Sequence, residues 1–89
     1  MRAVDDARIE HVIFDLLAAR ADGASICPSD VARALHDDER AWRALLPCVR
    51  DVAMQLARHR RLRFTRGAAT LDPEAPGRGP IRLRLPARA

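Results

Sequence analysis

The sequence predicts an α+β domain in which three amphipathic helices are followed by a two-stranded β-hairpin. Apolar residues recur with helical spacing through most of residues 6–59, whereas "RLRFTRG" (61–67) and "PIRLRL" (80–85) alternate apolar and arginine side chains as strands do. The chain has 89 residues, which suffice for one domain around one small core. We therefore expect a single domain over residues 1–89, with its ordered core at about 6–85.

The first helix is expected to begin at Asp5 or Asp6 and to run to about Arg20, because an aspartate side chain can accept the free amide hydrogens of a first turn. Its apolar residues follow the i, i+3, i+4, i+7 spacing of one helix face: Ile9, Val12, Ile13, Leu16 and Leu17. Phe14 lies off this stripe, and we expect it to pack against a later element.

The segment between the first two helices predicts a short edge strand near residue 26. "ADGA" (21–24) interrupts the helical pattern, and the apolar "SIC" follows it. Pro28 then suits the first position of a second helix, where its missing amide hydrogen removes no hydrogen bond. Cys27 falls at the cap position, and Asp30 completes a capping-box pattern.

Residues 40–59 predict one long helix in spite of an internal proline. The apolar positions keep a single helical phase on both sides of it: Trp42, Leu45, Leu46, Val49, Val52, Ala53 and Leu56. An internal proline typically costs about 3 kcal/mol, but Pro47 falls opposite this stripe, where a kink can curve the helix around the core. We expect one kinked helix or two nearly collinear pieces.

The two alternating segments predict a hairpin that covers the helices with one apolar face. Leu62 and Phe64 point inward in the first strand, and the connection "AATLDPEAPGRG" (68–79) is expected to be a long loop with turns at its Asp-Pro and Pro-Gly pairs. Helix, edge strand, short helix, long helix and hairpin is the order of a winged helix-turn-helix, with the hairpin as its wing.

Three ordered motifs, "SICPSDVARAL", "WRALLPCVRDVAMQLA" and "GPIRLRL", resemble a family of small bacterial proteins that is known only as a domain of unknown function. The resemblance covers about residues 9–85 and implies a winged-helix fold, but no activity. One position departs from the usual pattern of winged helices, which often have a glycine just after the long helix. Here that place holds Arg60, so the end of the helix is expected to differ, with His59 as its last residue.

The charge is divided unevenly along the chain. Residues 1–57 have seven arginines and ten acidic residues, giving −3, whereas residues 58–89 have nine arginines and two acidic residues, giving +7. Such a basic C-terminal part predicts an anionic partner, and nucleic acid is the first candidate.

The predicted nucleic-acid-binding residues lie on the long helix and the hairpin. They are Arg43, Arg50, Gln55, Arg58, Arg61, Arg63, Arg82 and Arg84. The four helix residues face away from the apolar stripe, where a winged helix meets a major groove. The hairpin arginines place like charges on one face, and a bound polyanion would relieve their repulsion. The sequence therefore predicts a non-enzymatic protein, regulatory in character, that binds duplex DNA.

A protein-interaction module is the alternative function, because the same fold could bind an acidic partner through the hairpin or an apolar one through Phe14 and Met54. Cys27 could also be a reactive thiol, although a small cysteine at a cap position is more often buried and inert.

The sequence contains no motif that is typical of a metal site, an enzyme or a membrane protein. We expect no metal or cofactor, because Cys27, His36 and Cys48 lack zinc-site spacing, and no enzyme activity, because no phosphate-binding loop or nucleophile with a spaced histidine occurs. No apolar run approaches the roughly 20 residues of a membrane span, and the N-terminus lacks the apolar segment of a secretory signal. We expect a cytoplasmic protein without a membrane partner.

Overall fold

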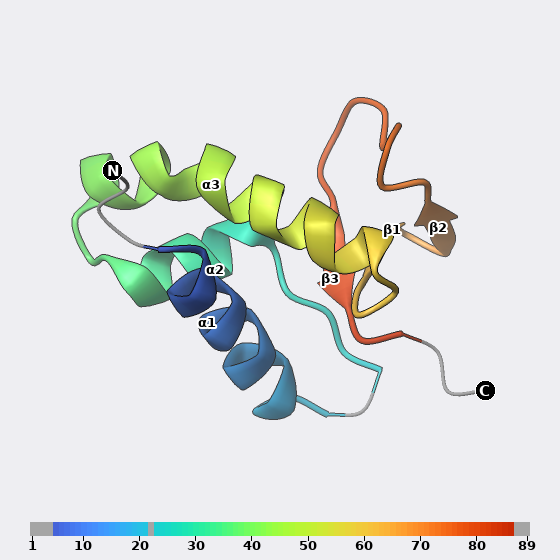
Figure 1. Cartoon of the computed structure of the whole chain (residues 1–89), viewed down its shortest axis with the longest axis horizontal. Helices are drawn as coiled ribbons and strands as arrows, with labels where there is room; N and C mark the ends of the chain where they lie inside the picture. The colour runs from blue at the N-terminus through green and yellow to red at the C-terminus, as the bar shows by residue number, and fades with distance from the viewer. Residues whose placement is uncertain (1–4, 22, 87–89) are drawn as a thin grey trace.

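The computed structural model describes residues 5–21 and 23–86, which form three helices and a three-stranded antiparallel sheet. The elements, in chain order, are α1 (Asp6–Ala18), α2 (Pro28–Leu35), α3 (Glu39–Arg58), β1 (Arg63–Arg66), β2 (Ala69–Leu71) and β3 (Arg82–Arg84). Helices α1 and α2 pack beneath α3, and the sheet lies beside the C-terminal half of α3 (Figure 1). The predicted α+β class is confirmed.

The helices begin where their capping residues predict. Asp5 accepts a hydrogen bond of 2.8 Å from the amide of Arg8 at the start of α1, which ends at Ala18 rather than near Arg20. The second helix begins at Pro28, and the Asp30 carboxylate accepts a bond of 2.9 Å from the Cys27 amide. This contact is one half of a capping box, in which the side chain at the third helical position accepts a hydrogen bond from the amide of the cap residue.

The third helix runs unbroken from Glu39 to Arg58 with Pro47 exposed inside it, so the prediction of one continuous helix is confirmed. It ends in a motif that normally has a glycine, with Arg60 in the left-handed region at a φ of 60°. The Arg60 amide donates to the Ala57 carbonyl at 3.0 Å, and the Arg61 amide donates to Leu56 at 2.8 Å. These two bonds satisfy carbonyls at the helix end and hold an arginine in a strained conformation.

The sheet differs from the predicted two-stranded hairpin. Strands β1 and β3 pair antiparallel with Phe64 opposite Leu83, as the alternation of side chains predicts. The segment expected to be only a loop, however, contains β2, which pairs with the other edge of β1 and gives the order β2-β1-β3. The reason lies in Gly67, whose φ of +59° allows a two-residue turn between β1 and β2. The connection to β3 is therefore a shorter loop, residues 72–81.

The predicted edge strand near residue 26 is present as a single bridge. The Ile26 amide donates to the Leu83 carbonyl at 3.0 Å, and the Leu83 amide donates to Ile26 at 2.7 Å. The segment between α1 and α2 is thus joined to the outer edge of β3, 57 positions later in the chain.

The core is formed by the apolar faces that the periodicity predicts. Its larger buried side chains are Ile9, Val12, Ile13, Leu17, Ile26, Val31, Leu45, Val49, Val52, Leu56, Leu62, Phe64 and Leu83. Phe14 is half-buried and packs against this core, as expected. Every helix and two of the strands therefore contribute to one cluster, as a domain of this length requires.

Candidate nucleic-acid interface

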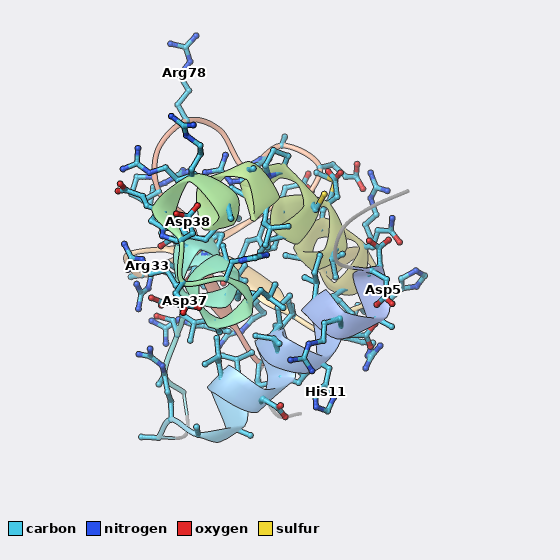
Figure 2. The ribbon with its side chains drawn as sticks, turned by 90° about the vertical axis from the view of Figure 1, so that its left-hand side faces the viewer. Asp5, His11, Arg33, Asp37, Asp38 and Arg78 are labelled. Carbon is cyan, nitrogen blue, oxygen red and sulfur yellow. The ribbon has the colours of Figure 1, made fainter. Side chains whose placement is uncertain are left out.

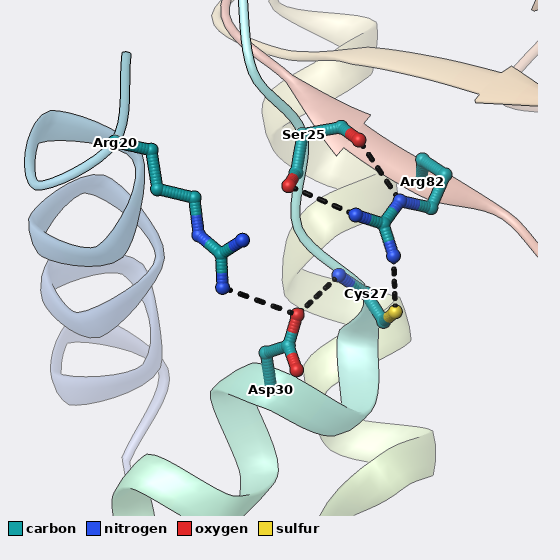
Figure 3. Close-up of polar contacts among 5 residues, drawn as sticks. All are labelled: Arg20, Ser25, Cys27, Asp30 and Arg82. Carbon is teal, nitrogen blue, oxygen red and sulfur yellow. Dashed lines mark hydrogen bonds and ion pairs between the residues drawn. The ribbon is translucent and has the colours of Figure 1, made fainter.

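Arg82 lies on the outer face of the sheet and is hydrogen-bonded to the segment before α2. Its Nε donates to the Ser25 hydroxyl at 2.9 Å, one Nη donates to the Ser25 carbonyl at 3.0 Å, and the other donates to the Cys27 sulfur. Beside this contact, Asp30 accepts from the Cys27 amide and forms an ion pair of 3.8 Å with Arg20 (Figure 3). The Arg82 guanidinium thus joins β3 to the neighbouring segment.

Two of the other three arginines of the strand pair, Arg84 and Arg63, are also used within the protein. Arg84 donates to the Thr65 hydroxyl at 3.2 Å and to the Gly23 carbonyl, and Thr65 is only 4% exposed. Arg63 donates to the Leu85 carbonyl at 3.1 Å. All these acceptors are neutral, so the hydrogen bonds fix the guanidinium groups and leave their positive charges uncompensated.

Arg58 and Arg61 are instead paired with acidic side chains. Arg58 binds the Glu74 carboxylate through Nε and through Nη2, the latter at 2.8 Å, and this hydrogen bond raises the pKa of Arg58 further above its ordinary value. Arg61 lies 2.6 Å from a Glu10 carboxylate oxygen and stacks over the Phe14 ring at 5.0 Å. The charge of each of these arginines is therefore balanced locally.

The eight predicted residues consequently do not form one patch. Gln55 and Arg61 line a hollow of about 280 Å³ between α1 and the end of α3, and Arg63 lines another of about 190 Å³ beside Leu71. Arg50 and Arg82 share a third hollow, of about 260 Å³. Each hairpin arginine that we expected to meet a polyanion donates a hydrogen bond to an acceptor within the chain.

The hollow at Arg50 lies between α3, the start of α2 and the 72–81 loop. Ser29 and Leu46 line it with Ile81 on the loop side. A smaller hollow of about 130 Å³ continues along α3 past Met54 to Gly77 and Gly79, and Arg50 and Ile81 belong to both. Arg50 is exposed, and no hydrogen bond or ion pair to it occurs within residues 5–21 and 23–86.

Further arginines lie on α2, on α3 and in the 72–81 loop. Arg33 of α2 and Arg43 of α3 both lie over the half-buried Trp42 ring, at 4.8 Å and 5.5 Å from its centre, and Arg43 also forms an exposed ion pair of 3.0 Å with Glu39. Arg43 and Arg50 are seven residues apart and so lie on the same side of α3. Arg78, between the two lining glycines, projects away from the body of the protein (Figure 2). We call Arg33, Arg43, Arg50 and Arg78 the arginine face.

Two members of the arginine face, Arg33 and Arg78, were not among the residues predicted from the sequence. Arg33 belongs to the arginine face because α2 packs beside α3, which places the Arg33 side chain over the Trp42 ring. Arg78 lies in the segment "PGRGP", whose glycines and prolines do indicate an exposed turn. The sequence of this turn indicates that Arg78 is exposed, but it does not indicate that the turn lies next to α3, which depends on how the 72–81 loop folds.

Within the part of the chain that the structure describes, no three His, Cys, Asp or Glu side chains gather as a metal site would require, and both cysteines are half-buried free thiols. None of the described helices combines the length and the apolar character needed to cross a bilayer.

The sequence was compared with known families and with curated proteins. The model of a family described as a protein of unknown function (DUF3253) matches residues 6–86. No curated protein matches the sequence.

Proposed function

The chain belongs to the DUF3253 family of proteins of unknown function, and we propose from its own residues that it is a non-enzymatic winged helix-turn-helix protein that binds duplex DNA through the arginine face. In this proposal α2 and α3, joined by the three residues 36–38, are the helix-turn-helix, α3 enters the major groove, and the 72–81 loop is the wing. A regulatory role in the cytoplasm would follow from such binding.

The observation that supports this proposal most directly is the state of Arg50. It is an exposed guanidinium on α3 with no partner among the described residues, and it lines the two hollows between α3 and the 72–81 loop. A guanidinium can bind a phosphate through two parallel hydrogen bonds, and an unpaired one does so without first breaking an internal contact. Arg43 and Arg78 extend the same positive surface along α3 and onto the loop.

Fluorescence anisotropy with a labelled DNA duplex, measured over a series of salt concentrations, tests the proposal. If Arg33, Arg50 and Arg78, the members of the arginine face without an acidic partner among the described residues, each meet a phosphate, log K should fall with log salt with a slope of roughly −2.7, from about −0.9 per contact. Arg50→Ala should weaken binding and reduce the slope by about 0.9.

Arg8→Ala is the matched control. It removes the same charge from an exposed position on α1, and Figure 2 shows His11 of α1 on the other side of the molecule from Arg33. This variant should keep the wild-type slope. Absence of duplex binding at low salt, or an Arg50→Ala slope equal to that of Arg8→Ala, would contradict the proposal.

The alternative, a protein-interaction module, has less support on the described surface. Phe14 is half-buried beneath Arg61, and Met54 is half-buried against the core. Leu85, at 47% exposure, is the one large hydrophobic side chain exposed among the described residues. Partners that remain bound to the protein after nuclease treatment of a lysate would favour this alternative.

A further inference from the structure

The contact between Arg58 and Glu74 has the geometry of an arginine that holds a phosphate. Two guanidinium nitrogens of Arg58, Nε and Nη2, meet the two oxygens of the Glu74 carboxylate. A carboxylate and a phosphodiester each offer two acceptor oxygens to the same planar pair of donors. Both side chains are about half exposed, at 48% and 55%, so a ligand in solution can reach this pair.

This pair lies along the surface to which we assign DNA binding. Arg50, Met54 and Arg58 follow one another at successive turns of α3. Glu74 belongs to the 72–81 loop, whose later residues, Gly77 and Gly79, line the hollow beside Arg50 and Met54. The carboxylate therefore adjoins the path that a duplex bound along the arginine face would follow.

We propose that Arg58 is a further phosphate-binding residue and that Glu74 occupies it in the free protein as an internal substitute for a DNA phosphate. This inference rests on the proposed function. A DNA phosphate must then displace the Glu74 carboxylate from Arg58. In the wild-type protein this arginine therefore adds little to the affinity for duplex DNA. The 72–81 loop thereby limits the affinity for nucleic acid.

The loop holds Glu74 in place for this exchange. The Asp72 carboxylate accepts a bond of 2.9 Å from the Glu74 amide, and the Asp72 carbonyl accepts one of 3.0 Å from the Ala75 amide. This turn fixes the backbone of Glu74 without using its side chain. Exposed ion pairs contribute little to folding, so the pair can open without loss of the fold.

The test compares Glu74→Gln with Asp72→Asn. Each variant removes one negative charge from the same loop and keeps the shape of the side chain, and asparagine preserves the turn that Asp72 makes. Only Glu74→Gln removes the carboxylate from Arg58. Measured by anisotropy, Glu74→Gln should bind duplex more tightly than Asp72→Asn and steepen the salt slope by about 0.9 relative to it.

That change in slope means that the advantage of Glu74→Gln over Asp72→Asn shrinks roughly threefold as salt rises from about 50 to about 200 mM. Adding Arg58→Ala to Glu74→Gln should return the slope to that of the wild type, and circular dichroism should show all the variants folded. Equal slopes for Glu74→Gln and Asp72→Asn, with measurable wild-type binding, would overturn this inference and leave the proposed function intact. Loss of binding in the wild type and in both variants would overturn the proposed function, and this inference with it.

Discussion

Replacing Arg82 of β3 should destabilise the fold more than replacing Arg63 of β1. The change Arg82→Met keeps the length and apolar stem of the side chain and removes its hydrogen bonds to Ser25 and Cys27. A hydrogen bond contributes about 0.5–1.5 kcal/mol net, and one to a charged group about 1.5–3. Because the site is only partly buried, each of the two bonds to Ser25 contributes in the lower range, and the bond to the Cys27 sulfur contributes little because sulfur is a weak acceptor. The expected loss is about 1–3 kcal/mol.

Urea unfolding followed by circular dichroism measures this loss, which corresponds to a decrease in Tm of roughly 5–20 °C for a domain of this size. Arg63→Met is the control, because that arginine makes a single bond, to the Leu85 carbonyl near the end of the described chain. Its expected cost is about 0.5 kcal/mol or less. Equal free energies of unfolding for the two variants would refute the conclusion that Arg82 joins β3 to the segment before α2.

Four further substitutions test the backbone. Pro47→Ala should stabilise the protein by about 2 kcal/mol, because it restores a helix hydrogen bond at an exposed position, and a lower Tm would show that the proline is needed. Arg60→Gly should raise the free energy of unfolding by about 1 kcal/mol, since it relieves the left-handed φ of 60°, and chemical denaturation that shows no gain would contradict that reasoning. Gly79→Ala should destabilise the protein by about 2–3 kcal/mol, because the Gly79 backbone has a φ of +108° and an added Cβ would lie 3.3 Å from Arg66 Nε. Gly67→Ala should cost only about 1 kcal/mol, because a Cβ added there meets nothing within 4 Å. Similar unfolding midpoints for the two variants would contradict this difference.

The helices could be predicted because their signals are local. Asp5 and Pro28 mark helix starts by their own chemistry, and the apolar phase across Pro47 shows that α3 continues. The pairing of β1 with β3 followed from alternation alone. Strand β2 did not, because "ATL" becomes a strand only through the turn at Gly67 and the free edge of β1.

The candidate site was only partly predictable from the sequence. The outward face of α3 predicted Arg43 and Arg50, although both lie outside the basic C-terminal part. Arg58 and Arg61 also face outward, yet each is paired with an acid that lies 16 or 51 positions away in the chain. No local pattern reveals such partners.

The sequence by itself determined most of the buried apolar residues, where the helices begin and how the positive charge is distributed, because each of these depends on residue type and near-neighbour spacing. Only the tertiary structure decided the roles of the individual arginines. A guanidinium on a long side chain binds whichever acceptors the fold brings within reach: Ser25 for Arg82 and Glu74 for Arg58, and, among the described residues, no acceptor for Arg50.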